Sequence, residues 1–228
     1  MASPYFTPQT ITFLRSLAKH NNRDWFEQNK SAYEDAVRLP SLQFITDIAD
    51  DLAVLSPHFM AQPKKVGGSL MRIYRDVRFS RDKRPYKTNI GIQFRHELGK
   101  DVHAPGFYVH IEPNECFVGV GIWRPDSTAL GKIRDRLCEQ GEQWLLTSND
   151  KVFKKHFSLG GQSLTNPPRG YAKDHPLLTD LKRKDFIAIS ALSINDVLST
   201  QFKKTVCDRF LVAAPYMQFL CQALALRY

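Results

Sequence analysis

Four runs of alternating apolar and polar residues follow one another between residues 70 and 123, with short connections between them. They cover 70–79, 90–95, 107–112 and 116–122, and Arg75 interrupts the apolar positions of the first. Strict alternation over several residues is typical of a strand with one buried face. Short connections favour antiparallel pairing, so the sequence predicts a central, largely antiparallel sheet with one apolar and one polar face.

Apolar residues at helical spacing precede and follow these runs, and 186–189 has the pattern of a fifth strand. Runs of strands flanked by runs of helices are typical of the α+β class. We therefore expect a single α+β domain over residues 1–228, with N-terminal and C-terminal helices around the sheet. Its expected parts are helices over 7–56, the sheet over 69–123, a mixed basic segment over 124–192 and helices over 193–226.

Several residues mark where these helices should begin or break. Thr7 followed by proline, Asn22, and Ser193 with Asp196 are typical of helix N-termini. Pro40 and Pro215 fall inside helical patterns, where proline removes a backbone donor. We expect each of these prolines to kink or divide a helix.

Positive charge is concentrated in two stretches of the chain. The formal net charge is +9, yet residues 64–95 hold ten lysines and arginines against two acids, and residues 151–184 hold eight against two. The remainder is slightly acidic. Two basic segments on an acidic body suggest an anion-binding face, although solvated surface cations without a ligand have the same composition.

The densest basic motif runs from 72 to 87. On a strand, Arg72 and Arg78 share one face with Tyr74 and Asp76 between them, and the planar guanidinium suits bidentate capture of phosphate. The alternative is a structural network in which aspartates pair with the arginines. The expected ligand-binding residues are Arg72, Tyr74, Arg75, Asp76, Arg78, Arg81, Lys83, Lys87, Tyr108, Trp123, Lys173 and His175.

A second group lies on the polar face of the expected sheet. Tyr108, His110 and Glu112 share one parity, while Gly119 and Gly121 on the next strand leave room above the sheet for a ligand or a covering element. A carboxylate beside an imidazole can tune it for acid–base work, so His110 and Glu112 are the candidate catalytic residues. A polar face that simply meets water or a helix explains the same residues.

Other chemistry finds little support in the sequence. There is no phosphate-binding loop, dinucleotide fingerprint or nucleophile elbow. The four cysteines are widely spaced and fit reduced, mostly buried thiols. His103 with His110 or Cys116 makes a poor ligand set, so we expect neither a metal nor a cofactor.

Three classes of function remain open. The first is binding of a phosphate-bearing ligand, either a nucleic acid or a nucleotide. The second is an enzyme acting on a phosphorylated small molecule, with His110 and Glu112 as the acid–base pair, and the third is a protein-interaction module. No apolar run reaches the roughly 18 residues of a membrane span, and the N-terminus lacks signal-peptide features, so we expect a cytoplasmic protein without a membrane partner. The oligomeric state stays open.

Motifs spread over nearly the whole chain resemble the family called domain of unknown function 2461. They are Asn21 to Phe26 with Asn29, Lys30, Tyr33 and Glu34; Arg72 to Ser80 with Lys83 and Pro85 to Lys87; Gly106 to Tyr108 with Ile111 to Pro113; Gly119 to Trp123; and Gly170, Tyr171 and Lys173 to Pro176. Arg84 departs from this pattern. The resemblance implies one intracellular domain and no established activity.

Overall fold

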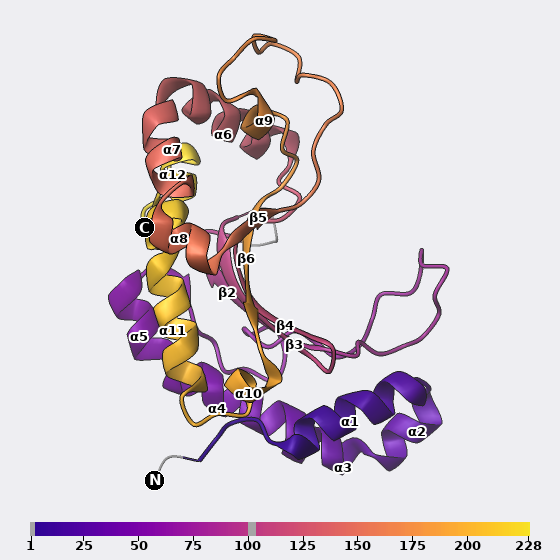
Figure 1. The fold of residues 1–228 in the computed structure, drawn as a ribbon. Coiled ribbons are helices and arrows are strands. Elements are labelled where there is room, and N and C mark those ends of the chain that lie inside the picture. The colour runs from indigo at the N-terminus through magenta and orange to yellow at the C-terminus, as the bar shows by residue number, and fades with distance from the viewer. Residues whose placement is uncertain (1–2, 100–103) are drawn as a thin grey trace.

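The computed structural model describes residues 3–99 and 104–228 of the chain. Its centre is a six-stranded sheet in the order β1-β2-β3-β4-β6-β5, in which every neighbouring pair is antiparallel (Figure 1). The strands are β1 (Phe59–Met60), β2 (Ile90–His96), β3 (Gly106–Glu112), β4 (Glu115–Ile122), β5 (Ser158–Gly160) and β6 (Phe186–Leu192). The expected α+β class is confirmed, as are the strands expected near 90–95, 107–112, 116–122 and 186–189.

Helices precede, interrupt and follow the sheet. Before β2 lie α1 (Pro8–Lys19), α2 (Arg23–Gln28), α3 (Lys30–Tyr33), the π-helix η1 (Glu34–Arg38), α4 (Leu39–Asp47) and α5 (Ala49–Leu55). After β4 lie α6 (Ser127–Glu139), α7 (Gly141–Ser148), α8 (Lys151–His156) and α9 (Leu178–Leu181). After β6 lie α10 (Ile194–Val197), α11 (Phe202–Val212) and α12 (Ala214–Ala223).

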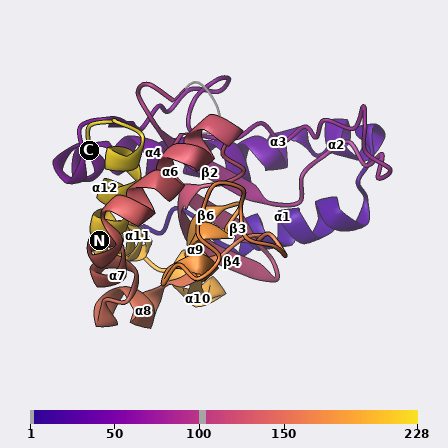
Figure 2. The ribbon, with the colours of Figure 1, turned by 90° about the horizontal axis from the view of Figure 1, so that it is seen from above.

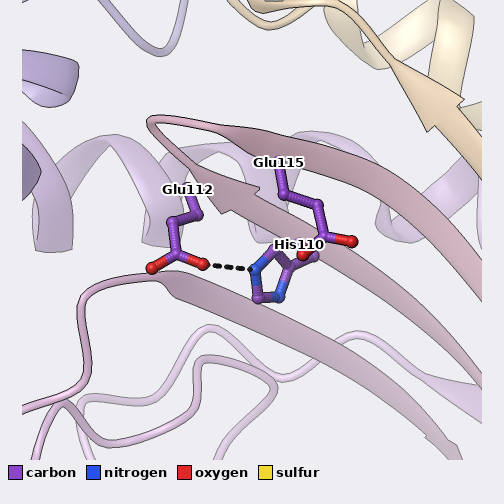
Figure 3. Close-up of side chains that lie close together, drawn as sticks. All are labelled: His110, Glu112 and Glu115. Atoms are coloured by element: carbon purple, nitrogen blue, oxygen red, sulfur yellow. Dashed lines mark ion pairs between the residues drawn. The ribbon is translucent and has the colours of Figure 1, made fainter.

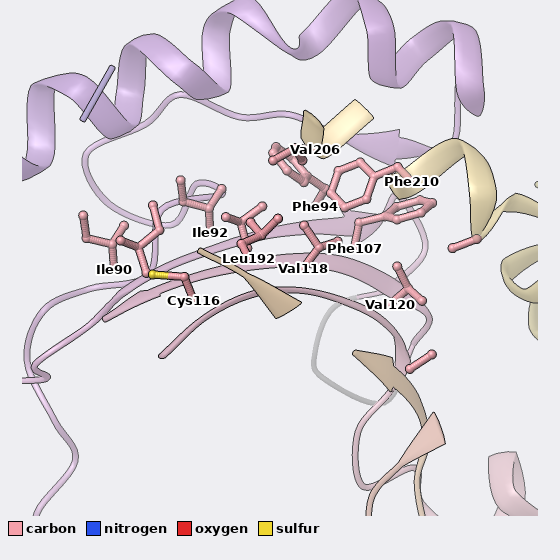
Figure 4. Close-up of a cluster of buried hydrophobic side chains, with 14 of the residues drawn as sticks. Ile90, Ile92, Phe94, Phe107, Cys116, Val118, Val120, Leu192, Val206 and Phe210 are labelled. Carbon is pink, nitrogen blue, oxygen red and sulfur yellow. The ribbon is translucent and has the colours of Figure 1, made fainter. Parts of the chain in front are cut away.

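One face of the sheet is buried under α11 and α12, as expected for its apolar parity (Figure 1). Phe210 of α11 packs on the sheet, with its ring centroid 4.5 Å from that of Phe107 on β3 and 5.9 Å from that of Phe94 on β2. Figure 4 shows these rings together with the aliphatic side chains of the same face. Fully burying an aromatic or aliphatic side chain of this size contributes about 1.5–3 kcal/mol, so each buried member of this layer stabilises the fold.

The expected helix boundaries are confirmed. The Asn22 side chain accepts the Trp25 N–H at 2.9 Å, and Ser193 forms a capping box with Asp196. Pro40 stands in the first turn of α4, directly after the π-helical turn, and Pro215 stands in the first turn of α12, where α11 has just ended. Both prolines therefore mark helix starts, where their missing N–H costs nothing.

The strand expected over 70–79 is wrong. Leu70 forms an isolated bridge to Ile92, and the chain then leaves the sheet. Residues 72–87 form a long hairpin-shaped loop, which we call the arm. Its two sides meet through a bridge between Tyr74 and Tyr86 and through the hydrogen bond from the Lys87 N–H to the Ile73 carbonyl. The alternation predicted a strand because Ile73 is buried at the arm base, but Phe79 at the tip is 95% exposed.

The arm base is anchored to the N-terminal helices. The Asn21 side chain donates to the Tyr86 carbonyl at 2.9 Å and accepts the Tyr86 N–H at 3.0 Å. The Tyr86 ring stacks on Phe26 of α2 at 4.2 Å. Figure 2 shows the arm extending toward the same end of the molecule as α2. These contacts fix where the arm returns to the sheet at Thr88.

The two basic segments lie at opposite edges of the sheet. The arm leaves from the β2 side, whereas residues 151–184 surround β5, which forms the other edge. Three strands, β3, β4 and β6, separate β2 from β5. A single continuous basic surface of the kind the charge count suggested would have to span the width of the sheet (Figure 1).

Candidate functional site

The face of the sheet opposite α11 and α12 carries a pocket of about 380 Å³. Strand register places Tyr108 opposite Gly119 and His110 opposite Phe117, so side chains from β3 and β4 form its floor. Gly119 lines the pocket, where a Cβ would meet only ordinary contacts of 3.5 Å or more. The expectation that Gly121 also leaves room above the sheet is wrong, because a Cβ there would lie 2.0 Å from the Phe186 carbonyl oxygen. The lining residues are Met71, Gln93, Ala104, Gly106, Tyr108, His110, Phe117, Gly119, Val120, Gly121, Trp123, Ile187 and Ile189.

His110 occupies one end of this pocket and is held on three sides. Its ring stacks on Phe117 at 4.7 Å with an interplanar angle of 6°. Its Nδ1 lies 3.1 Å from the Tyr108 hydroxyl and 3.4 Å from the Asn89 amide nitrogen. Burial raises the pKa of Tyr108 to about 12, so its hydroxyl stays protonated at neutral pH. The imidazole is therefore fixed in orientation.

The other ring nitrogen of His110 faces Glu112. Nε2 lies 3.5 Å from Glu112 Oε2 and is a buried atom without a hydrogen-bond partner (Figure 3). The Thr88 hydroxyl donates to Glu112 Oε1 at 2.6 Å and so directs the second oxygen toward the ring. The expected pairing of His110 with Glu112 on one sheet face is thus present in the structure.

Sequence reasoning missed Glu115, Thr88 and Asn89. Glu115 is the register partner of Glu112 across the β3–β4 turn, and its carboxylate lies in the same group as His110 and Glu112 (Figure 3). The available signal was parity, because Glu115, Phe117 and Gly119 alternate along β4 toward the open face. Thr88 and Asn89 are placed by the arm base, which periodicity did not predict.

Aspartates neutralise much of the arm. Asp76 forms two hydrogen bonds with the Arg78 guanidinium, at 3.0 and 2.7 Å, and these lower the pKa of Asp76 to about 2. Asp82 contacts both Arg84, at 2.7 Å, and Arg75, at 2.6 Å, and its pKa is lowered by these bonds. The structural network that the sequence left open as an alternative therefore involves three of the arm's arginines.

Arg72 and Lys87 at the arm base differ from those arginines. Within the described residues, neither forms an ion pair with a carboxylate. Burial lowers the pKa of Lys87, and the nearby Arg72 lowers it further. Arg72 follows the pocket residue Met71, and Lys87 precedes Thr88. Asp76 lies near enough for the Arg72 charge to help lower the Asp76 pKa. Arg72 and Lys87 thus stand next in sequence to a pocket residue and to Thr88 of the His110 group.

The remaining expected binding residues are dispersed. Arg81 and Lys83 are exposed near the arm tip, and Tyr74 packs on Phe26 and Tyr86. Trp123 lines the pocket, with the Arg124 guanidinium 4.7 Å from its ring centroid. Lys173 and His175 lie in the loop after β5, where His175 Nδ1 accepts the Leu177 N–H. The structure brings Tyr108, His110 and Trp123 to one pocket, places Glu112 beside His110 outside its lining, and leaves Lys173 and His175 at the far edge.

The described cysteines are free thiols. Cys116 and Cys221 are buried, Cys207 is half-buried and Cys138 is exposed. His103 of the rejected metal set lies outside the described residues. None of the described helices is both long and apolar enough to cross a membrane.

These features define an α+β protein with an antiparallel sheet, helices on one face and a pocket of small-molecule size on the other. In a comparison with protein families, the family model described as conserved hypothetical protein (DUF2461) matches residues 9–219. The chain belongs to this family. The match confirms the resemblance inferred from the motifs. No curated protein matches the sequence.

Proposed function

We propose that the protein binds a small phosphate-bearing molecule of about nucleotide size in the pocket on the open sheet face. The observation that carries this proposal is the pocket itself. Its volume of about 380 Å³ falls near the lower end of the roughly 300–1,000 Å³ typical of small-molecule sites. Its lining is mainly apolar and aromatic, with Gln93, Tyr108 and His110 as polar groups, and this combination suits a flat ring with a few hydrogen-bonding atoms.

The arm base supports a phosphate at one end of such a ligand. The Arg72 charge helps to lower the Lys87 pKa, so the two cations repel each other and an anion between them would lower the energy of both. Arg72 offers the planar donor pair that suits phosphate, and Lys87 adds a second charge. Arg72 follows the lining residue Met71 in sequence, and Lys87 precedes Thr88, which donates to Glu112 beside the lining residue His110.

A single nucleotide fits these observations better than a nucleic-acid strand. Strand-binding grooves combine a continuous basic track with several stacking aromatics. Here the two basic segments occupy opposite sheet edges, and aspartates pair with three arginines of the arm. The contact between His110 and Glu112 favours a second candidate function, in which the bound phosphorylated molecule is also converted, with this pair as acid and base.

Isothermal titration with adenosine, cytidine, guanosine and uridine monophosphate tests the binding proposal. We expect saturable binding of at least one of them at a single site. Gly119→Val should weaken this binding, because the added side chain enters the pocket from a position where a Cβ meets only ordinary contacts of 3.5 Å or more. Lys87→Ala should weaken it as well, whereas the matched arm-tip variant Lys83→Ala should not.

Fluorescence anisotropy with a labelled single strand of roughly 12 nucleotides is the companion measurement, since one strand-binding fold covers about 4–16 nucleotides. Strand binding that depends on Lys83 and not on Gly119 would refute the pocket and favour the nucleic-acid alternative. Absence of binding in both assays would leave the interaction-module alternative. Turnover of a bound monophosphate that is lost in His110→Gln while binding persists would establish the enzyme.

A further inference from the structure

The group formed by His110, Glu112 and Glu115 brings two carboxylates and an imidazole nitrogen close together. Glu112 Oε2 faces His110 Nε2, and Glu115 reaches toward the imidazole from β4, so that one ligand atom of each residue lies within 4.8 Å of the others (Figure 3). Within the described chain, no lysine or arginine forms an ion pair with either carboxylate. Two carboxylates side by side repel each other, so this arrangement calls for a cation between them.

We propose that His110, Glu112 and Glu115 bind a divalent first-row transition-metal ion, with Nε2 of His110 and one carboxylate oxygen of each glutamate as ligands. One imidazole and two carboxylates form a mixed nitrogen–oxygen set that suits Zn²⁺, Mn²⁺ or Fe²⁺. The proposal goes beyond the binding function, because it concerns an ion and not the molecule held in the pocket.

The distances fit a metal ion better than a direct hydrogen bond. Ligand atoms about 2.1 Å from a metal lie about 3.0–3.4 Å apart at octahedral to tetrahedral angles. His110 Nε2 and Glu112 Oε2 are 3.5 Å apart, and no hydrogen bond joins them. All three candidate ligand atoms lie within 4.8 Å of one another. Glu115 is exposed, so a side-chain rotation suffices to bring its oxygen into range.

Neighbouring groups hold two of the ligands in place. A metal-bound histidine usually donates its other N–H to a fixed acceptor, and the Tyr108 oxygen lies 3.1 Å from Nδ1. Metal binding requires the tautomer in which Nδ1 carries the proton and donates to the Tyr108 oxygen, because Nε2 then keeps its lone pair for the metal. The Thr88 hydroxyl occupies the other oxygen of Glu112 in the same way. Both ligands therefore have the outer partners that metal sites have.

A second histidine–glutamate pair in the same chain provides the contrast. His58 Nδ1 and Glu97 Oε1 are 2.7 Å apart, which is hydrogen-bond distance, and Arg227 lies 3.7 Å from the same carboxylate. A hydrogen bond between the two side chains and the charge of Arg227 stabilise that pair without a metal ion. The His110 group has the longer separation, a second carboxylate and no arginine, and these three differences are what a metal ion requires.

Three protein ligands leave coordination positions open on the sheet face. Because His110 also lines the pocket, these positions can accept an oxygen of a bound ligand. This last step rests on the proposed function, whereas metal binding itself does not.

The test uses the full-length protein after dialysis against a chelator. Zn²⁺ and Mn²⁺ are titrated separately by calorimetry, and Co²⁺ is followed by its visible absorption, all without an organic ligand. We expect one ion per chain and a rise in the melting temperature on binding. Glu112→Gln and Glu115→Gln, which keep side-chain shape, should each weaken binding by at least about tenfold, since even outer-partner changes cost 10–100-fold. The matched control Glu97→Gln should bind as wild type does.

Three results would overturn the proposal. The first is the absence of stoichiometric binding by all three ions, which would mean that a proton bridges His110 and Glu112. The second is binding that both glutamine variants retain. The third is an intense sulfur-to-cobalt charge-transfer band, which would place the ion at a thiol such as Cys116, whose Sγ donates to the Glu112 carbonyl. Because no nucleotide is present, failure here leaves the pocket proposal standing, and failure of the nucleotide titrations leaves this one standing.

Discussion

Gly119 and Gly121 lie two residues apart on β4, yet only Gly121 occupies a position that requires glycine. Gly121 has a φ of +110°, and a Cβ at this position would lie 2.0 Å from the Phe186 carbonyl oxygen on β6. Gly119 shows no such constraint, because its Cβ would meet Phe117 at 3.5 Å and Tyr108 at 3.6 Å. We therefore predict opposite outcomes for Gly121→Ala and Gly119→Ala.

The magnitudes follow from these contacts. In Gly121→Ala, a non-glycine residue at this φ costs about 1–3 kcal/mol, and overpacking against a neighbouring strand costs about 1–3 kcal/mol more. The free energy of unfolding should fall by about 2–6 kcal/mol. At about 2–4 °C per kcal/mol for a chain of this length, the melting temperature should fall by roughly 4–24 °C. Gly119→Ala should raise stability by about 0.5–1 kcal/mol, because alanine loses less backbone entropy in a strand.

Urea unfolding monitored by tryptophan fluorescence, with calorimetric melting as the second probe, measures both variants. Equal urea midpoints for the two variants would refute the reasoning, since it assigns the whole difference to the φ of Gly121 and to the Phe186 carbonyl. A destabilised Gly119→Ala with an unaffected Gly121→Ala would contradict the strand register from which both contacts were measured. A changed urea dependence without a changed midpoint would instead indicate an altered unfolded state.

Three further predictions concern the arm and the thiols. Asn21→Ala removes both side-chain hydrogen bonds to the Tyr86 backbone and should lower the free energy of unfolding by about 1–3 kcal/mol in urea and speed tryptic cleavage of the arm. Burial and the nearby Arg72 lower the pKa of Lys87 in the folded protein, so keeping this lysine charged destabilises the fold below that pKa. Lys87→Met should therefore be more stable than wild type at neutral pH. The difference in melting temperature should close as the pH rises toward 10.5, the pKa of a free lysine. Ellman's reagent should label one thiol of the native protein quickly, and Cys138→Ser should abolish that phase, because the other described thiols are buried or half-buried.

Local patterns predicted the regular elements of this fold well. Alternation identified β2, β3 and β4 because each has one face against helices, which is the condition that produces a period of two, whereas β6 was expected from the short apolar run at 186–189. The same signal failed at 70–79. Ile73 is buried at the arm base and exposed charges follow it, so the residues alternate, but the segment forms only isolated bridges and no strand pairing. Alternation in the sequence indicates which residues are buried, but a strand also needs backbone hydrogen bonds to a neighbouring strand.

Part of the candidate site was predictable for the same reason. Parity alone placed Tyr108, His110 and Glu112 on one face, and Gly119 on β4 indicated space beside them, whereas Gly121 is a glycine because of its φ and its approach to β6. The contributions of Thr88 and Asn89 were not predictable, since they depend on where the arm rejoins the sheet, and that point is set by Asn21, far away in the sequence. Contacts across such separations leave no periodic signal in the chain.

Charge counting along the sequence indicated a basic arm, but the structure divides that charge into two kinds. Toward the tip, each aspartate of the arm binds one or two arginines, and these pairs are exposed, so they contribute little to stability or to a long-range field. Among the described residues, Arg81 and Lys83 near the tip and Arg72 and Lys87 at the base form no ion pair with a carboxylate, but only the two base residues stand next in sequence to residues that line the pocket or hold Glu112. A ligand gains most from cations that no protein carboxylate already neutralises. The base of the arm, and not its more numerous tip charges, is therefore where anion recognition should be measured first.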